Sequence, residues 1–406
     1  MADHERYDVI VIGAGIAGSA LALALGGNGL RIALVEARPV PKTELPTGLE
    51  LATFDARVSA LTPRSRASLE QLGAWQDIAD YRNCAYNHMT VWDAEGTGEI
   101  EFDASEVGAE SLGHIVENRA ITQALLRRVE QAADIQLICP ASLESCQRDD
   151  QGHLQVLLGD GTSLSTELLV AADGALSPVR ELLSFATREW DYGHRAIVTT
   201  VQVEASHQAT AWQRFLPSGP LAFLPLPGDD EHHFCSIVWS LDDDLVDDLL
   251  ALDTPAFCAE LGGAIEHRLG RMLDCGQRFA FPLRQRHAVD YVQPGVALVG
   301  DAAHTIHPLA GQGINLGLQD VMVLAEEVVR ACESGGSPGA LETLRRYQRR
   351  RKGDNLLMMA AMDGFKRLFE QDALPIRWLR NAGMRQVGRI QPLKRQLIRH
   401  AMGIGD

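Results

Sequence analysis

Cysteines are few in this sequence of 406 residues, and they follow no pattern. The seven are scattered and odd in number, and no two of them form a CxxC pair. A disulfide framework or a zinc site needs paired or regularly spaced cysteines. Their absence predicts reduced thiols in a cytosolic protein, with neither a disulfide framework nor a zinc site.

Basic residues and long apolar runs are also scarce. The chain has 37 Lys and Arg against 54 Asp and Glu, and its formal net charge of −17 argues against a nucleic-acid-binding protein. Only residues 9–30 form an uncharged stretch that could suggest a signal peptide or a membrane span. The residues before it, "MADHERYD", are net acidic rather than basic, and its interior is rich in glycine. We therefore expect a soluble or peripheral protein, and the length suggests two domains.

The uncharged stretch opens a strand–helix–strand unit. "DVIVI" predicts a buried strand, and GxGxxG follows it at Gly13, Gly15 and Gly18. The helix-forming "AGSALALAL" ends at "GGNG", and "RIALVE" predicts a second buried strand that ends in Glu36. This order predicts dinucleotide binding. The alternative is a glycine-rich strand–helix turn without a ligand.

Each residue type in this unit has a physical reason. Gly13 permits the tight turn, Gly15 lets the backbone approach a pyrophosphate, and Gly18 lets the helix pack close to the sheet. The helix N-terminus offers free N–H groups and a partial positive charge to phosphates. Glu36 can accept hydrogen bonds from a ribose diol and would repel a 2′-phosphate, so the site suits NAD or FAD rather than NADP. We assign the whole loop to the cofactor: Gly13, Ala14, Gly15, Ile16, Ala17 and Gly18.

The rest of the chain predicts an α/β protein interrupted by antiparallel strands. The expected elements are a loop and then a helix from Pro63 within residues 57–75, an amphipathic helix over 117–132, a hairpin with an Asp-Gly turn within 135–166, a strand, turn and helix over 167–183, antiparallel strands over 190–282, and helices after residue 304.

Three charged segments allow two interpretations each. Asp242–Asp248 predicts a solvated helix start rather than a calcium loop, because the glycine and glutamate of such a loop are missing. Arg345–Lys352, "RRYQRRRK", predicts the solvated face of a helix, with partner docking as the alternative. Leu374–Gly405 has seven Lys or Arg and no acid, and it is either an ordinary packed helix or a contact with an anionic membrane surface or acidic partner.

Three motifs together carry a resemblance. GxGxxG is followed by "ADG" at Ala172–Gly174 and by "GDAAHTIHPLAGQGINLG" at Gly300–Gly317. In this order they resemble the single-component flavin aromatic hydroxylases, which are the group A monooxygenases of the para-hydroxybenzoate hydroxylase fold. Further sequence segments such as "RVSALT", "LGHIVEN" and "CSIVWSL" resemble those of the ubiquinone-biosynthesis hydroxylases, most closely the branch that hydroxylates a 2-polyprenylphenol at ring C5.

The resemblance implies a fold and a set of cofactors. The fold is α/β, with a Rossmann-like FAD-binding domain (1–75, 105–185 and 285–345) interrupted by an antiparallel β-sheet substrate domain (76–104 and 186–284) and followed by C-terminal helices (346–406). FAD is bound, NAD(P)H or another reductant supplies electrons, and O₂ is the oxidant, activated as a C4a-hydroperoxide of the flavin. Since the chain has a single GxGxxG unit, NAD(P)H must bind transiently elsewhere.

The resemblance also assigns residues. It implies that Arg119 reaches the FAD phosphate–ribityl region, that Asp173 and Gly174 make a second contact near the pyrophosphate with a part in NAD(P)H use, and that Asp301, after Gly300, binds the ribityl hydroxyl. Arg57 matches an arginine near the isoalloxazine face. The alternatives are an exposed helix charge for Arg119 and a surface charge for Arg57.

The third motif would surround the flavin ring. Pro308, Gly311, Gln312 and Gly313 would wrap the isoalloxazine, where small residues allow close backbone approach. The helix that follows, starting with Ile314 and Asn315, would point its N–H groups at flavin N1 and C2=O. His304 and His307 could share one helix face, but no third ligand accompanies them, so no metal is expected. No Ser–His–Asp order stands out either.

Two other classes stay open as alternatives. A flavin halogenase shares the GxGxxG fold, but its usual WxWxIP stretch is missing here. A prenyl-lipid binding protein on the same fold would not need the third motif. The expected partners are a polyprenylphenol substrate and other ubiquinone-biosynthesis proteins or lipid-binding accessory factors, without nucleic acid, in a homo-oligomer. The expected location is cytoplasmic, with peripheral contact to the inner membrane.

Overall fold

The computed structural model describes residues 5–40, 44–150, 152–305, 313–369, 377, 380–384, 386 and 390–404. The predicted strand–helix–strand unit at the N-terminus is confirmed. β1 (Glu5–Ile12), α1 (Ile16–Leu25) and β2 (Ile32–Val35) follow one another. Gly26 ends the helix, and its N–H donates to the Ala22 carbonyl.

A largely parallel sheet is built around β1. Within the described ranges it has eight strands, of which five run parallel in the order β19–β11–β1–β2–β8. Its other strands are β8 (Ile135–Ile138), β9 (Leu143–Arg148), β10 (Leu154–Leu158), β11 (Ser163–Ala171), β18 (Val292–Gln293) and β19 (Val296–Leu298). The side chains of β2 are all buried, as is typical of a parallel strand covered on both faces. The predicted Asp-Gly hairpin is confirmed, because β10 and β11 pair antiparallel around Asp160 and Gly161.

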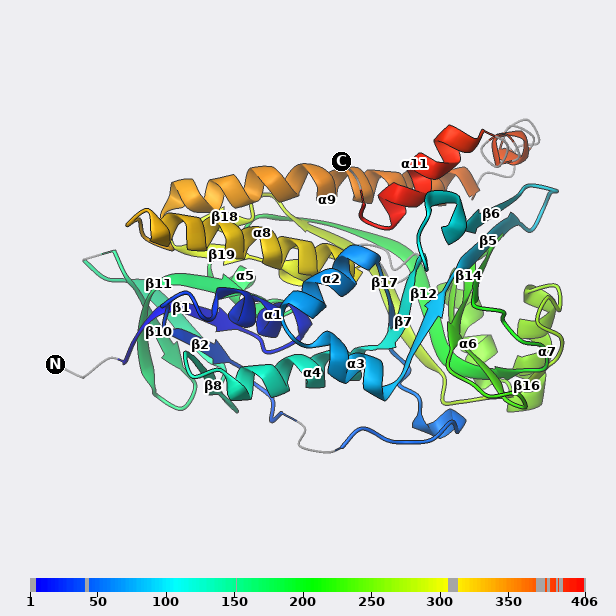
Figure 1. Cartoon of the computed structure of the whole chain (residues 1–406), viewed down its shortest axis with the longest axis horizontal. Coiled ribbons are helices and arrows are strands. Elements are labelled where there is room, and N and C mark those ends of the chain that lie inside the picture. Colours follow the sequence, from blue (N-terminus) through cyan, green and yellow to red (C-terminus); the bar gives the residue numbers. More distant parts are fainter. Residues whose placement is uncertain are drawn as a thin grey trace.

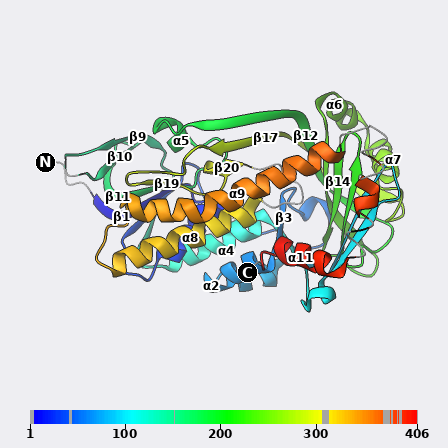
Figure 2. The same cartoon turned by 90° about the horizontal axis from the view of Figure 1, so that it is seen from above.

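Mostly antiparallel strands form a second sheet, of nine strands in the part of the chain that the structure describes. They are β5 (His88–Asp93), β6 (Glu99–Asp103), β12 (Thr187–Val203), β13 (Thr210–Leu216), β14 (Gly219–Leu226), β15 (His233–Asp242), β16 (Met272–Cys275), β17 (Phe279–Ala288) and β20 (His304–Thr305). α6 (Asp243–Ala251) and α7 (Thr254–Ala264) cover its outer face (Figure 1), where Val246, Phe257 and Leu261 join its core. The long strands β12 and β17 run from the first sheet to the second (Figure 2).

A small third sheet corrects one prediction. The helix predicted from Pro63 is present as α2 (Pro63–Gln71), and the Thr62 hydroxyl caps it by accepting from Ser65 N–H at 3.2 Å. The residues before it form strand β3 rather than a loop. β3 (Val58–Leu61) pairs with β7 (Gly113–Glu117), which also pairs with β4 (Asn83–Tyr86). A four-residue strand carries too little alternation to be told from a loop.

Two long helices, α8 (Gly313–Glu333) and α9 (Leu341–Phe369), lie one above the other in Figure 1. The prediction of a solvated face at Arg345–Lys352 is wrong for two residues. Tyr347 and Arg351 are only 0% and 2% exposed, and the Tyr347 hydroxyl donates to the Leu298 carbonyl at 2.7 Å. Their side of α9 faces α8 and the sheet, and the partners come from segments that spacing along the helix cannot reveal.

Ion pairs between these helices centre on Glu327 of α8, which is 1% exposed. Its carboxylate accepts from Arg350 at 2.7 Å and from Arg346 at 3.0 Å, both on α9. Arg330, one turn along α8, adds a third contact at 3.2 Å. Removing a buried partner of such a set leaves an uncompensated charge and destabilises the fold.

Acidification is expected to weaken this helix pair. Burial alone would raise the pKa of the Glu327 carboxyl, but the bonds from Arg350 and Arg346 outweigh it and hold the pKa below its usual range. Such a carboxyl stabilises the fold above the unfolded pKa of about 4.3, and the contribution is lost as pH falls through the folded value. The thermal unfolding midpoint should therefore fall as pH drops below about 5, and Glu327→Gln should flatten part of that fall. An unchanged pH profile in the variant would contradict this prediction.

The basic C-terminal segment is partly neutralised inside the protein. Arg377 pairs with Glu95 at 3.2 Å, Arg380 with Asp93 at 2.6 Å. A third pair joins Lys394 to Glu106 at 2.5 Å, on the short helix η2 (Ala104–Val107) against which α11 (Gln391–Ala401) packs. The segment is therefore docked by charge onto the β5–β6 region, and three of its seven cations are not free for an outside partner.

The predicted fold class is confirmed: an α/β unit with a parallel sheet, an antiparallel sheet inserted in it, and helices at the C-terminal end. The boundaries drawn between an FAD-binding unit, a substrate unit and C-terminal helices stay predictions. Among the helices that the structure describes, none combines the length and the apolar character needed to cross a bilayer.

Candidate functional site

Four of the predicted motifs meet at one edge of the parallel sheet. The GxGxxG loop follows β1, Glu36 follows β2, Asp173 follows β11, and the Gly300–Asp301 turn follows β19. These strands are neighbours and run parallel, so their carboxyl ends lie side by side. In open α/β sheets this edge is where ligands bind.

The glycine loop has room at one position and none at another. A Cβ at Gly15 would meet nothing within 4 Å, although Gly15 is the N-cap of α1. A Cβ at Gly18 would lie 1.8 Å from the Gly13 carbonyl oxygen, so only glycine lets the helix pack this closely on the turn. Gly13 itself has φ +101°, which favours glycine. Open space before a helix N-terminus is what a bound pyrophosphate requires.

Glu36 reaches across to this loop. Its Oε2 accepts from Ala14 N–H at 2.9 Å, and its Oε1 accepts from Arg38 N–H at 2.9 Å. The carboxylate is thus fixed beside the turn and keeps acceptor capacity for a ribose diol. The loop residues Ile16 and Ala17 begin α1, and a Cβ on Gly300 would meet the Ala17 Cβ at 3.4 Å.

Asp173 carries an unsatisfied oxygen. Its Oδ2 accepts from Val179 N–H at 3.0 Å, whereas its Oδ1 is buried with no hydrogen-bond partner in the described chain. Burial raises the pKa of this carboxyl above its usual range, although bonds from Ser177 and Val179 oppose the shift. An orphaned acceptor beside the glycine loop fits a ligand hydroxyl. Gly174 follows with φ +85°.

The Gly300–Asp301 turn places a second acid at the same edge. Asp301 lies on the short helix η3 (Gly300–Ala302), and its side chain is exposed. Desolvation nevertheless raises the pKa of its carboxyl, with His304 and Arg57 opposing. Solvent reaches the Asp301 carboxylate although many protein atoms lie around it. Such a carboxylate is accessible to a ligand that takes the place of this solvent. Arg57 is exposed, and its guanidinium carbon lies 6.0 Å from the Phe281 ring centre.

Arg180, unassigned by the sequence, ties two of these motifs together. Its side chain is 3% exposed and donates to the Ala302 carbonyl at 2.9 Å and the Ala175 carbonyl at 2.8 Å. One guanidinium thereby joins the segment after β11 to the segment after β19. The only signal in the sequence was its position shortly after "ADG".

The start of α8 is described from Gly313 onward. Gly313 lies near Asp301, since a Cβ there would meet Asp301 Oδ1 at 3.9 Å. The Asn315 amide is used internally: it accepts from Thr62 N–H at 3.0 Å and donates to the Ala60 carbonyl at 2.8 Å. A cofactor role for Asn315 or Ile314 would therefore fall to their backbone N–H groups. Pro308, Gly311, Gln312 and His307 lie outside the described residues.

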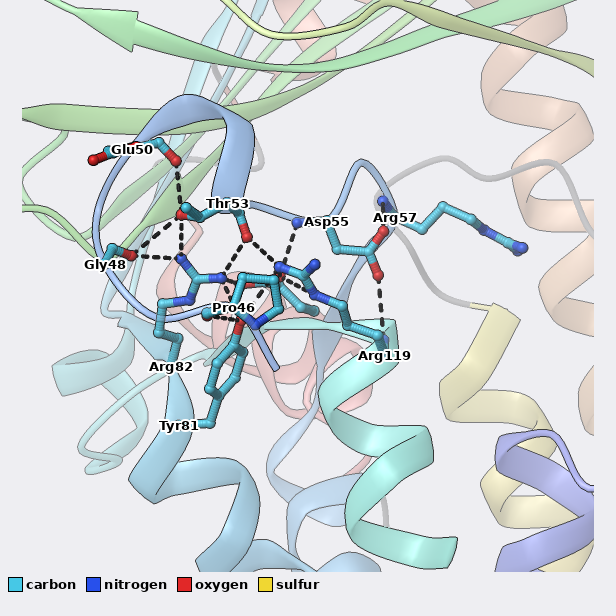
Figure 3. Close-up of polar contacts among 10 residues, drawn as sticks. Pro46, Gly48, Glu50, Thr53, Asp55, Arg57, Tyr81, Arg82 and Arg119 are labelled. Carbon is cyan, nitrogen blue, oxygen red and sulfur yellow. Dashed lines mark hydrogen bonds and ion pairs between the residues drawn. The ribbon is translucent and has the colours of Figure 1, made fainter. Parts of the chain in front are cut away.

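Arg119 belongs to a second cluster of charges (Figure 3). It lies in the first turn of α4 (Asn118–Gln131) and binds Glu117 Oε2 at 2.5 Å and the Thr53 carbonyl. Arg82 binds the other Glu117 oxygen at 2.9 Å and the same Thr53 carbonyl at 2.7 Å. Burial raises the pKa of the Glu117 carboxyl although both arginines oppose it. Arg119 is thus neither a free helix charge nor aimed at the glycine loop in this structure, and its cofactor role stays a prediction.

The idea that His304 shares a helix face with His307 is wrong for His304. It lies on β20, 1% exposed, with its Nε2 2.5 Å from Asp320 Oδ2. Among the described residues, no three His, Cys, Asp or Glu side chains are grouped as metal ligands would be.

The residues at the sheet edge fit FAD. The open helix N-terminus at Gly15 would hold the pyrophosphate, Glu36 the adenosine ribose, and the Asp173 and Asp301 carboxylates other hydroxyls of the dinucleotide. The bound flavin supplies the two-electron chemistry that activates O₂.

The comparisons with known proteins agree. The family described as FAD binding domain (FAD_binding_3) matches residues 6–358. Ubiquinone hydroxylase UbiL of Rhodospirillum rubrum is 39% identical over 98% of this chain and 89% of its own length. The 3-demethoxyubiquinol 3-hydroxylase of Escherichia coli is 37% identical over 99% and 100%. Ubiquinone biosynthesis monooxygenase COQ6 of Homo sapiens is 34% identical over 97% and 92%.

Solved structures share the fold at lower identity. The p-nitrophenol 4-monooxygenase PnpA of Pseudomonas putida has a TM-score of 0.77 and 18% identity, covering 98% of each chain. HpxO of Klebsiella pneumoniae, solved with FAD and uric acid, has a TM-score of 0.71 and 19% identity, covering 100% of this chain and 99% of that one. The chain therefore belongs to the FAD binding domain family and is an FAD-dependent monooxygenase.

Proposed function

We propose that this chain hydroxylates the ring of a polyprenylphenol in ubiquinone biosynthesis, at ring position C5. The observation that carries the pathway is similarity over nearly the full length to three hydroxylases or monooxygenases whose names place them at ubiquinone or its precursors. The C5 position is supported by the sequence resemblance to that branch.

In this reaction one atom of O₂ enters the ring, the other leaves as water, and NAD(P)H supplies two electrons. The residues of the chain itself bind and orient the cofactor. The N-terminus of α1 would hold the cofactor phosphates, Asp301 the ribityl chain, and the first N–H groups of α8 the negative charge that collects on the reduced ring. Arg57, Pro308, Gly311, Gln312 and Gly313 are proposed to lie at the ring itself.

A second position has an observation in its favour. The Escherichia coli relative, which this chain matches end to end, is named as a 3-hydroxylase. Deleting the gene for this chain and identifying the quinone intermediate that accumulates separates the two positions, because the missing hydroxyl names the ring carbon. Accumulation of the 2-polyprenylphenol that still lacks its C5 hydroxyl supports the proposal, accumulation of a ring that lacks only the oxygen at the other position supports the second candidate, and unchanged ubiquinone contradicts both.

We also propose peripheral membrane contact through α11, to bring the enzyme to its apolar substrate. Leu393 and Leu397 share one exposed face of this helix, and Arg395 and Arg399, for which no ion-pair partner is described, share another. Basic and apolar side chains together favour anionic lipid surfaces. Association with other proteins of the pathway or with lipid-binding accessory factors, and a homo-oligomeric state, are further proposals.

Charge reversal tests this contact. The double variant Arg395→Glu/Arg399→Glu should reduce co-sedimentation with vesicles that contain anionic lipid, because it replaces attraction with repulsion at about 1 kcal/mol per charge. Lys394→Gln is the matched control: its ammonium is held by Glu106, so its loss should leave vesicle binding unchanged. Equal binding by the wild-type and double-variant proteins would contradict the proposal.

A further inference from the structure

A buried group of polar side chains lies directly behind the Gly300–Asp301 turn. We call it the Asp320 cluster; it comprises Asp320, His304, Arg351 and Asn355. Asp320 lies on α8 and Arg351 and Asn355 on α9, while His304 comes from β20. The exposed fractions of the four are between 0% and 2%. Nothing in the proposed reaction uses these groups.

Every acceptor site of the Asp320 carboxylate is occupied. Oδ2 accepts from His304 Nε2 at 2.5 Å and from the backbone N–H of Gly300 at 3.2 Å. Oδ1 accepts from Arg351 Nε at 2.8 Å and from Asn355 Nδ2 at 3.1 Å. A carboxylate has about four lone-pair sites, so this set leaves none free for another partner.

The cluster holds a charged carboxylate in the interior. Burial alone would raise the pKa of Asp320, but His304 and Arg351 outweigh it and hold the pKa below its usual range. A fully satisfied buried network of this kind fixes one arrangement of the elements that contribute to it. Here those elements are α8, α9, β20 and the turn after β19.

One of the four donors links the cluster to the candidate flavin site. Gly300 has φ +57°, in the left-handed region, and its N–H is the donor to Asp320. The next residue is Asp301, the proposed ribityl ligand. His304 also acts on Asp301 through its charge, since it opposes the pKa rise that burial causes there. Asp320 therefore holds the turn through the Gly300 N–H, and His304 lowers the pKa of the Asp301 carboxyl.

We propose that Asp320 and His304 are positioning residues for the flavin: they hold the Gly300–Asp301 turn in the one geometry that presents the Asp301 carboxylate to the ribityl chain. The inference rests on the proposed role of Asp301. Neither residue would touch the cofactor itself.

The chain offers a matched control on the same helix. Asp320 and Glu327 lie seven residues apart on α8, both are at most 1% exposed, and both are bound by arginines of α9. Only Asp320 contacts Gly300 and His304. Asp320→Asn and Glu327→Gln should both lower the unfolding temperature of the apoprotein. Only Asp320→Asn should weaken FAD binding, by about tenfold or more, measured by quenching of flavin fluorescence.

Equal losses of FAD affinity in the two variants would overturn the inference, because the cluster would then act through stability alone. Rescue gives a second readout. Nε2 makes the only described hydrogen bond of the His304 ring, and a glutamine amide can donate to the same acceptor. His304→Gln should keep most of the FAD affinity that His304→Leu loses; equal affinities in these two variants would also overturn it.

A double-mutant cycle separates this inference from the role of Asp301. If Asp320 acts through Asp301, the double variant Asp301→Ala/Asp320→Asn should bind FAD no more weakly than Asp301→Ala alone. Additive losses would overturn the inference and leave Asp301 as a ligand. If Asp301→Ala binds FAD normally while Asp320→Asn does not, the inference falls together with the role of Asp301, and the proposed hydroxylation stands untouched.

Discussion

Apoprotein that carries Gly15→Val is expected to fold normally and to lose FAD binding by about 100-fold or more. The backbone of Gly15 has φ −71° and ψ −170°, which valine adopts readily, and a Cβ there would meet nothing within 4 Å. The new side chain would occupy the space before the N-terminus of α1, where the pyrophosphate must approach. Titration with FAD and thermal unfolding of the apoprotein measure the two effects separately.

Two other glycines provide controls for this result. Gly18→Ala puts a Cβ 1.8 Å from the Gly13 carbonyl oxygen, so it should lower the stability of the apoprotein itself. Gly263→Ala, on α7 and also in open space, should change neither stability nor FAD affinity by much. Native FAD affinity in Gly15→Val would contradict the assignment of the glycine loop to the cofactor.

Arg380→Leu is expected to destabilise the protein by about 3–5 kcal/mol, because it leaves a buried carboxylate without its cation. The side chains of Arg380 and Asp93 are each 1% exposed and lie 2.6 Å apart, and the guanidinium also donates to the carbonyls of Leu368 and Phe369. The lost bonds join the end of α9 to β5. Chemical denaturation of the variant and the wild type gives the difference in free energy of unfolding.

Arg377→Leu is the matched control for this prediction. Arg377 and Glu95 are 3.2 Å apart, but their side chains are 27% and 26% exposed, and partly solvated pairs contribute about 1 kcal/mol or less. Losses of similar size in the two variants would show that burial of the Asp93 pair does not govern its contribution.

Local patterns in the sequence predicted much of the fold and the edge where the site lies. Apolar runs and glycine spacing predicted β1, α1 and β2. The predicted residues Glu36, Asp173 and Asp301 follow neighbouring parallel strands, so the sheet brings them together. Strand order itself could not be predicted, since β11 lies between β19 and β1 through contacts distant in sequence.

The sequence also could not predict which residues pair with the buried charges, because these partners lie far apart along the chain. His304, Asp320 and Arg351 are separated by 16 and 31 residues, and no helical or strand period joins them. The arginine-rich segment Arg345–Lys352 was predicted to be solvated because periodicity cannot show that its arginines contact Glu327 and Asp320 of the neighbouring helix. Arg119 was expected to be free for a phosphate, and only the structure reveals Glu117 and Thr53 beside it.

If this chain is a polyprenylphenol hydroxylase, it inserts one atom of O₂ into the ring of its substrate. The direct test gives the purified FAD-loaded protein a 2-polyprenylphenol in detergent and NAD(P)H or a chemical reductant under ¹⁸O₂, and follows the product by mass spectrometry. We expect a hydroxylated product that carries one ¹⁸O on the ring. A hydroxyl derived from water, or consumption of reductant and O₂ without any hydroxylated ring, would contradict it.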